Sequence, residues 1–215
     1  MTTSKVVTVV DYGLGNLFSV ERALAAVGAQ ARFAQRAEDL LAADRVILPG
    51  VGAFADGMRG LTERGLLAPI QEVVARGTPL LGICLGMQLL MTEGHEFGHH
   101  QGLGVLPGAV VPIPPPDANG GYKVPNMGWG RLLPAASDTS WQGTVLADVK
   151  RGEHVYFVHG FVVQPSVEQH AVAMAECGPH RFCASVRREN VHGTQFHPEK
   201  SGPAGQAILS AFLKM

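Results

Sequence analysis

The chain has 215 residues with 17 basic and 18 acidic side chains, a length that allows one globular domain spanning 1–215 and a charge balance that offers no basic stripe for nucleic acid. No apolar run approaches the roughly 20 residues that cross a bilayer, and the polar N-terminal segment 1–5 lacks the features of a signal peptide. We therefore expect one cytoplasmic domain, with neither nucleic acid nor a membrane as a partner.

The first half of the chain alternates short apolar runs with amphipathic stretches. Residues 6–10 predict a buried strand, and the apolar residues of 17–27 then recur at helical spacing, with Asn16 as the N-cap and Gly28 as the stop. Strands separated by helices predict right-handed crossovers and a mostly parallel sheet, whose functional groups collect at the carboxyl ends of the strands. Further elements follow in the order strand 45–48, helix 67–75 and strand 78–83.

The second half has a different texture, because Gly and Pro interrupt short β-like pieces after about Gly102. These pieces predict mixed or antiparallel strands added to the parallel sheet. We expect a loop over 114–121 and a C-terminal helix over 202–215. The expected strands of this half are 105–113, 154–163, 171–175 and 191–196.

A glycine-flanked cysteine follows the strand 78–83. Gly82 and Gly86 stand on either side of Cys84, and good helix formers come next, so the pattern matches a strand-turn-helix elbow that carries a nucleophile. Such a turn exposes the thiol in a strained conformation, the start of the helix favours the thiolate, and the Leu85 amide faces a developing oxyanion. Taken alone, the pentapeptide fits equally well a cysteine buried as a small hydrophobic residue.

Cysteine usage is consistent with a reducing compartment. The three cysteines, Cys84, Cys177 and Cys183, are odd in number and widely scattered. Such a set does not suit a disulfide framework, and none of the three forms a Cys-x-x-Cys metal clip. We expect free thiols, one of them reactive.

A histidine and a glutamate near the end of the predicted strand 191–196 supply a base and its orienting group. Pro198 favours an extended His197, so His197 and Glu199 are expected to project from the strand end on one side. Glu199 then holds the imidazole in the tautomer that a thiol nucleophile needs. A histidine chosen blindly among the nine is more often a surface residue, but its coupling with the elbow favours a triad of Cys84, His197 and Glu199.

Three ordered motifs together resemble the triad (class I) glutamine amidotransferases: Pro-Gly-Val-Gly at 49–52, Gly-Ile-Cys-Leu-Gly-Met-Gln at 82–88 and His-Pro-Glu at 197–199. Further matches, at 11–16, 127–129, 156–159 and 199–202, resemble the glutaminase subunit family of imidazole glycerol phosphate synthase over almost the whole chain. The resemblance implies an α/β, flavodoxin-like three-layer sandwich, with a mostly parallel central sheet flanked by helices and added antiparallel strands in the second half.

The resemblance also implies the roles of individual residues. Cys84 attacks the side-chain amide of glutamine and His197 moves the proton, so that ammonia leaves and water hydrolyses the glutamyl thioester. No cofactor and no metal are implied. The residues implied to form the oxyanion hole or to bind glutamine are Gly50, Val51, Gly52, Leu85, Gln88, His159, Gly160 and Phe161.

In that family the ammonia passes to a (β/α)8 barrel synthase subunit of a heterodimer, which makes imidazole glycerol phosphate and aminoimidazole carboxamide ribotide in histidine biosynthesis. A sealed pair makes physical sense, because ammonia in neutral water is mostly protonated and loses its nucleophilicity. Met127 and Trp129 fit ordinary core packing equally well. The matches to the family's docking face are Asn16, Met127, Trp129, Tyr156 and Lys200.

Four positions depart from the family pattern. Asn126 and Gly130 stand where a His and an Asn usually flank Met-Gly-Trp. Gly160 and Phe161 replace the usual Ser and Tyr after the histidine, which removes two hydroxyls near the expected glutamine site. The triad chemistry does not need these groups. The four departures leave open the alternative that the chain is a paralogous glutaminase subunit that serves a different ammonia-using barrel synthase.

Three readings compete with the glutaminase. The first is a zinc protease, because residues 95–99, His-Glu-Phe-Gly-His, match its signature. That chemistry needs a helix, but Gly94, Gly98 and Gly102 bracket the segment, and each interior glycine costs a helix about 1 kcal/mol. We therefore expect a loop and no zinc. The second is another cysteine hydrolase on the same fold, and the third is a catalytically idle binding module. The intact triad argues against the idle module.

Overall fold

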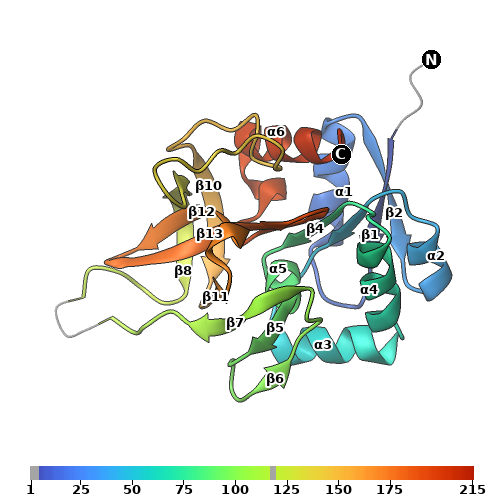
Figure 1. The fold of residues 1–215 in the computed structure, drawn as a ribbon, viewed down its shortest axis with the longest axis horizontal. Coiled ribbons are helices and arrows are strands. Elements are labelled where there is room, and N and C mark those ends of the chain that lie inside the picture. The colour runs from blue at the N-terminus through green and yellow to red at the C-terminus, as the bar shows by residue number, and fades with distance from the viewer. Residues whose placement is uncertain (1–4, 117–119) are drawn as a thin grey trace.

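The computed structural model describes residues 5–116 and 120–215 and shows a sheet that is parallel at one end, with helices on both faces, and largely antiparallel at the other (Figure 1). Residues 1–4 of the N-terminal segment and residues 117–119 of the expected loop 114–121 lie outside the described residues. Among the described residues, no helix combines the length and apolar character that a membrane span needs.

The parallel part of the main sheet has the spatial order β2, β1, β3, β4 and β14. Counted along the chain, this is the 2-1-3-4-5 order of flavodoxin-like folds, as predicted. The C-terminal β14 pairs with β4, so the segment before His197 lies beside the strand that ends at Cys84. The strands are β1 (Lys5–Val10), β2 (Ala29–Ala34), β3 (Val46–Leu48), β4 (Leu80–Ile83) and β14 (Val191–Thr194).

Helices cover both faces of this sheet and complete the three layers. α1 (Leu17–Ala26) and α6 (Gly202–Phe212) bury Val20, Leu24 and Ile208 in one apolar cluster. A second cluster on the opposite face is formed with α2 (Ala37–Leu41), α3 (Phe54–Glu63), α4 (Leu67–Ala75) and α5 (Leu85–Leu89). The predicted cap of α1 is confirmed, because the Asn16 side chain accepts the Ser19 N–H at 3.2 Å.

Antiparallel strands extend the sheet beyond β14, as the second half of the sequence predicted. β13 (His180–Arg188) pairs with β14, β12 (Ala171–Cys177) and β11 (Phe161–Pro165). β11 continues to β7 (Leu106–Pro112), and the sheet ends at β5 (Met91–Gly94) and β6 (His100–Gln101). The short β9 (Leu133–Pro134) pairs with β12.

Several expected boundaries are wrong, and one of them is the end of the C-terminal helix, which is at Phe212 and not at residue 215. The single strand predicted over 154–163 is two strands in different sheets, because the chain turns at Gly160: β10 (His154–His159) pairs with β8 (Asn126–Arg131) in a separate antiparallel ribbon, and β11 joins the main sheet. The strand predicted over 191–196 ends at Thr194.

Candidate active site

Cys84 stands at the sharp turn between β4 and α5, with φ 53° and ψ −111°. This left-handed conformation is rare for a residue with a side chain and agrees with the predicted strained elbow. The flanking glycines are required by close packing, because a side chain at Gly86 would collide with the Leu48 carbonyl and one at Gly82 would lie 2.8 Å from the Met87 backbone. The Leu85 N–H, the first of α5, has no intrahelical partner.

His197 and Glu199 are hydrogen-bonded to each other beside this elbow. Nδ1 of His197 lies 2.6 Å from Oε1 of Glu199, and the two side chains are only 2 % and 3 % exposed. The expectation that both project from a strand end is wrong, because Pro198–Lys200 form a 3-10 turn and His197 is the extended residue before it. The turn folds Glu199 back onto the imidazole ring.

The imidazole of His197 is set up to carry a proton. Burial alone lowers its pKa, but the neighbouring Cys84 side chain and the Glu199 carboxylate outweigh burial and raise the pKa to about 9. Nε2 of His197 is buried and has no partner at hydrogen-bond distance among the described residues, yet the Cys84 side chain is close enough to be the first cause that raises the pKa of the ring. At neutral pH the ring is therefore mostly imidazolium.

Cys177 and Cys183 differ from Cys84 in their surroundings. All three cysteines are free and buried. Burial raises the pKa of Cys177, and it raises the pKa of Cys183 to about 12. Neither is therefore a thiolate at neutral pH.

A cavity of about 280 Å³ opens in front of the Cys84 side chain. Gly50 lies behind it, where a side chain would collide with the Tyr12 hydroxyl, and that hydroxyl donates to the Pro49 carbonyl at 2.8 Å. Val158 and Glu96 line the cavity and were not among the predicted site residues. The predicted residues that line it are Val51, Gly52, Leu85, Gln88, His159, Gly160 and Phe161.

Two amide side chains connect the cavity lining to the thiol: Gln88, which lines the cavity, and Gln195, which is buried behind the lining residues. Nε2 of Gln88 donates to the Phe161 carbonyl and to Oε1 of Gln195, both at 3.1 Å. Nε2 of Gln195 in turn donates to the Cys84 sulfur at 3.7 Å. Sequence reasoning gave Gln195 no role, although its place two residues before His197 puts it on the same segment.

His159 is a neutral, fixed wall of the cavity. Nδ1 is 3.0 Å from the Phe161 carbonyl and Nε2 is 3.0 Å from the Asn126 amide nitrogen, so the ring donates on one side and accepts on the other. Burial, joined by the charge of His197, lowers the pKa of His159 to about 4. Asn126, one of the four departures, thus fixes this ring. Gly130, another, packs against the Phe157 ring, 3.0 Å from where its Cβ would stand.

Glu96 comes from the segment that matched the zinc-protease signature. That segment is the loop between β5 and β6, as expected, and the helix required for the protease is not there. His95 and His99 both bind the Glu93 carboxylate, at 3.0 and 2.9 Å. Glu96 accepts the Phe54 N–H at 2.6 Å and lines the cavity.

Four of the five residues predicted for docking, Met127, Trp129, Tyr156 and Lys200, lie together on β8, β10 and the turn that carries Glu199. Met127 is 66 % and Trp129 59 % exposed, so core packing does not account for either. Trp129 lies edge-on to Tyr156 with ring centroids 6.0 Å apart, and Nζ of Lys200 is 5.8 Å from the Tyr156 ring centroid. Asn16 is the N-cap of α1.

Comparison with known proteins gives a match over nearly the whole chain. Residues 8–215 match the family Glutamine amidotransferase class-I. The chain is 45 % identical to the imidazole glycerol phosphate synthase subunit HisH of Syntrophotalea carbinolica, covering 96 % of this chain and 98 % of that one. It is 41 % identical to the subunit HisH 1 of Legionella pneumophila (strain Lens), covering 97 % and 99 %.

Solved structures share the fold at low sequence identity. One described as a glutamine amidotransferase has a TM-score of 0.72 at 20 % identity, with 96 % of this chain and 97 % of that chain covered. A chain from the structure of PurLQS from Thermotoga maritima has a TM-score of 0.70 at 21 % identity, with 99 % of both chains covered.

Proposed function

This chain belongs to the class-I glutamine amidotransferases, and we propose that it is the glutaminase subunit of an imidazole glycerol phosphate synthase. It hydrolyses glutamine to glutamate and ammonia and passes the ammonia to a (β/α)8 barrel subunit for histidine biosynthesis. The observation that carries the proposal is the His197–Glu199 hydrogen bond of 2.6 Å beside a cysteine that lines a cavity. The whole chain, 1–215, acts as one domain, and its free thiols suit the reducing cytoplasm.

The cavity suits a free amino acid. Its volume of about 280 Å³ lies just below the roughly 300–1,000 Å³ of typical small-molecule sites, as expected for a ligand as small as an amino acid. The Glu96 carboxylate offers an anion for the α-ammonium group of glutamine. Both N–H groups of Gln88 are engaged within the protein, so its Oε1 is left to accept from the glutamine amide. These features support glutamine over a peptide.

The first half-reaction transfers the glutamyl group to sulfur. The Cys84 thiolate attacks the side-chain carbonyl carbon of glutamine, and the oxygen takes up negative charge beside the Leu85 N–H and the loop that carries Val51 and Gly52. His197 then gives the proton on Nε2 to the departing nitrogen, and the C–N bond breaks. Ammonia and a thioester on Cys84 result.

The second half-reaction restores the enzyme. Water attacks the thioester carbonyl while His197, now neutral, takes one of its protons. The C–S bond breaks, glutamate leaves, and the thiolate–imidazolium pair is regenerated. Glu199 keeps Nδ1 protonated throughout, so that Nε2 is the nitrogen that exchanges protons with the substrate.

A barrel partner fits the exposed surface formed by Met127, Trp129, Tyr156 and Lys200. Aromatic and Met side chains with a neighbouring cation are typical of the centre of an interface. The departures at Gly160 and Phe161 leave, as a second candidate, a paralogous glutaminase subunit that serves a different ammonia-using barrel synthase. The missing hydroxyl at Gly160 is not excluded by packing, since a Cβ there would meet only Val124, at 3.9 Å.

Copurification with candidate barrel subunits, followed by a glutaminase assay with and without the barrel and its nucleotide ligand, tests the proposal. We expect glutamate release that increases when both are added. Ester or peptide turnover without glutamine hydrolysis would instead indicate another cysteine hydrolase, and partner binding without any turnover would indicate an idle module.

A further inference from the structure

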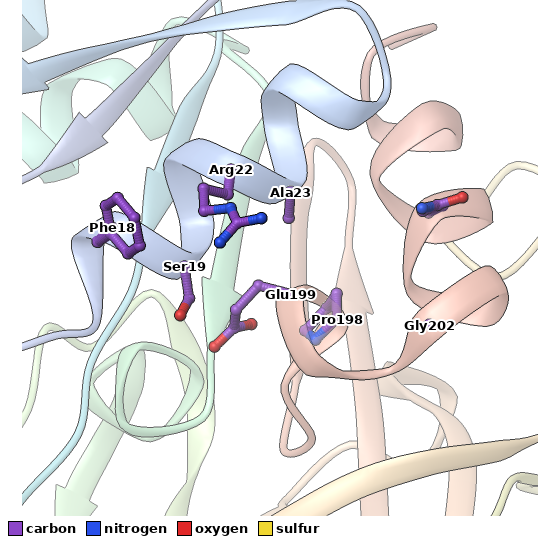
Figure 2. A pocket seen from close by; sticks show the side chains of 8 residues that line it. Phe18, Ser19, Arg22, Ala23, Pro198, Glu199 and Gly202 are labelled. Carbon is purple, nitrogen blue, oxygen red and sulfur yellow. The ribbon is translucent and has the colours of Figure 1, made fainter.

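A second cavity, of about 330 Å³, is lined by Glu199 and not by His197. Residues of α1, the 3-10 turn and α6 line it, and Figure 2 shows Ser19 and Arg22 across the cavity from the Glu199 carboxylate. It shares no lining residue with the cavity in front of Cys84. The lining residues are Phe18, Ser19, Arg22, Ala23, Pro198, Glu199, Gly202 and Gln206.

Glu199 presents an unsatisfied oxygen at this cavity. Its Oε1 binds His197, whereas Oε2 is buried and has no hydrogen-bond partner among the described residues. A buried carboxylate oxygen without a donor is costly, and native proteins rarely leave one unpaired. The charge that orients His197 therefore requires a donor from the cavity side.

Ser19 is the donor whose position the fold fixes best. It lies in the first turn of α1, where its backbone N–H is held by the capping Asn16 side chain at 3.2 Å. Its side chain is half-buried, short and uncharged, so a hydroxyl bond to Glu199 costs little conformational entropy. Arg22 is exposed, and its guanidinium lies over the Phe18 ring at 5.7 Å. It therefore contributes positive potential near Glu199 rather than a hydrogen bond of fixed geometry to the carboxylate.

We propose that Ser19 is a positioning residue for the triad: its hydroxyl donates to Oε2 of Glu199, directly or through one water molecule in the cavity. Oε1 is then left to His197, and the carboxylate cannot rotate away from the ring. The inference rests on the proposed glutaminase activity. It also ties the start of α1, where Asn16 lies, to the geometry of the triad.

The test measures glutamine hydrolysis by the full chain, together with its barrel subunit, for Ser19→Ala and Ser19→Thr. A hydrogen bond to a charged group is worth enough for its loss to lower kcat about tenfold. KM should change less than about twofold, because Glu199 does not touch glutamine. Ser19→Thr keeps the hydroxyl and should retain most of kcat. Ser210→Ala, a half-buried helix serine that lines neither cavity, is the matched control and should behave as wild type.

A double-mutant cycle separates positioning from a structural effect. In a Glu199→Gln background, Ser19→Ala should lower kcat no further, since the charge it serves is gone. Additive losses, equal defects in Ser19→Ala and Ser19→Thr, or a loss in Arg22→Ala with none in Ser19→Ala would overturn the inference. If the wild-type complex itself releases no glutamate, the proposed function fails, which is a distinct result.

Discussion

The backbone N–H of His197 donates to the carbonyl of Tyr156 at 2.9 Å. Strand β10 therefore connects three parts of the molecule: its Tyr156 ring lies beside Lys200 in the proposed docking surface, its backbone holds His197, and its Val158 and His159 line the cavity in front of Cys84. Ser201 strengthens the connection, because its hydroxyl donates to the His197 carbonyl at 2.7 Å and accepts the Tyr156 N–H at 3.0 Å. If the proposed barrel subunit binds at Tyr156, we expect it to act on His197 through this one strand.

Cys84→Ala is expected to abolish ammonia release and to leave partner binding intact, since the thiol is needed for the chemistry and is not among the residues predicted for docking. The loss should be about 10³-fold or more, because the covalent route is removed. Glutamate release and copurification with the barrel are the two measurements. Cys177→Ala removes a protonated thiol on β12 and serves as the control. Wild-type turnover by the Cys84 variant would refute the mechanism.

Lys200→Ala should weaken coupling to the barrel more than folding. Lys200 is exposed and lies over the Tyr156 ring, so it contributes little to the core. The loss of one exposed charge at an interface is worth roughly 1 kcal/mol, or about fivefold in partner affinity. Titration of the stimulated glutaminase rate with barrel subunit measures this loss. Lys214→Ala, which removes an exposed lysine paired with Asp148, is the control. Unchanged stimulation would count against the assigned docking surface.

Much of the fold was predictable because its signals are local. The strand before Cys84, the elbow, the cap at Asn16 and the helix over 67–75 each depend on neighbouring residues. The missed helix α3 depends on distant ones instead. Its Gly57 and Gly60 lower helix propensity, but Cβ atoms there would press on Leu89 and the Tyr12 backbone, so close packing overrides propensity. β2 was missed because only its terminal residues, Ala29 and Ala34, are buried.

The site was predictable to the extent that its residues stand in recognisable motifs. Glu96 was hidden inside a motif for different chemistry, and only the hairpin between β5 and β6 brings it to the cavity. The way Glu199 reaches His197 was also not predictable, since a strand and a 3-10 turn both place residues two apart within reach. Gln195 contacts Cys84 across 111 positions, a pairing that depends on β14 lying beside β4.

Glu199→Gln should lower the pKa of His197 from about 9, because it removes the carboxylate that, together with the Cys84 side chain, outweighs burial. The folded-state pKa of His197 lies above the ordinary 6.5, so the proton on this ring stabilises the folded protein. This contribution to the free energy of unfolding is fully present below pH 6.5 and is lost as the pH rises through about 9. NMR titration of the ring protons of His197 measures the pKa, and unfolding at pH 6 and 9.5 measures the stability. An unshifted titration would show that Glu199 does not hold the imidazolium.

His192 should make the protein sensitive to acid. It is 2 % exposed in β14, and burial, joined by the charge of Arg187, lowers its pKa to about 4. Between pH 6.5 and 4, His192 takes up a proton more readily in the unfolded chain than in the folded one. The free energy of unfolding therefore falls as the pH drops through that range, by on the order of 2 kcal/mol. Urea unfolding at pH 7.5 and 4.5 should show a smaller drop in His192→Leu than in wild type. His154→Gln, at an exposed histidine of β10, should keep the wild-type drop.

Phe97→Ala should weaken glutamine binding more than it slows the chemistry. Phe97 is 89 % exposed with φ 54°, and it lies edge-on to Phe161 with ring centroids 6.2 Å apart. An aromatic pair of this kind is worth about 0.5–1.5 kcal/mol, and we expect it to fix the loop that carries Glu96, which lines the cavity. We expect KM for glutamine to rise roughly threefold to tenfold, with kcat nearly unchanged. Phe33→Ala, at a partly exposed phenylalanine of β2, is the control. An unchanged KM would show that the Phe97–Phe161 contact does not hold Glu96 in place.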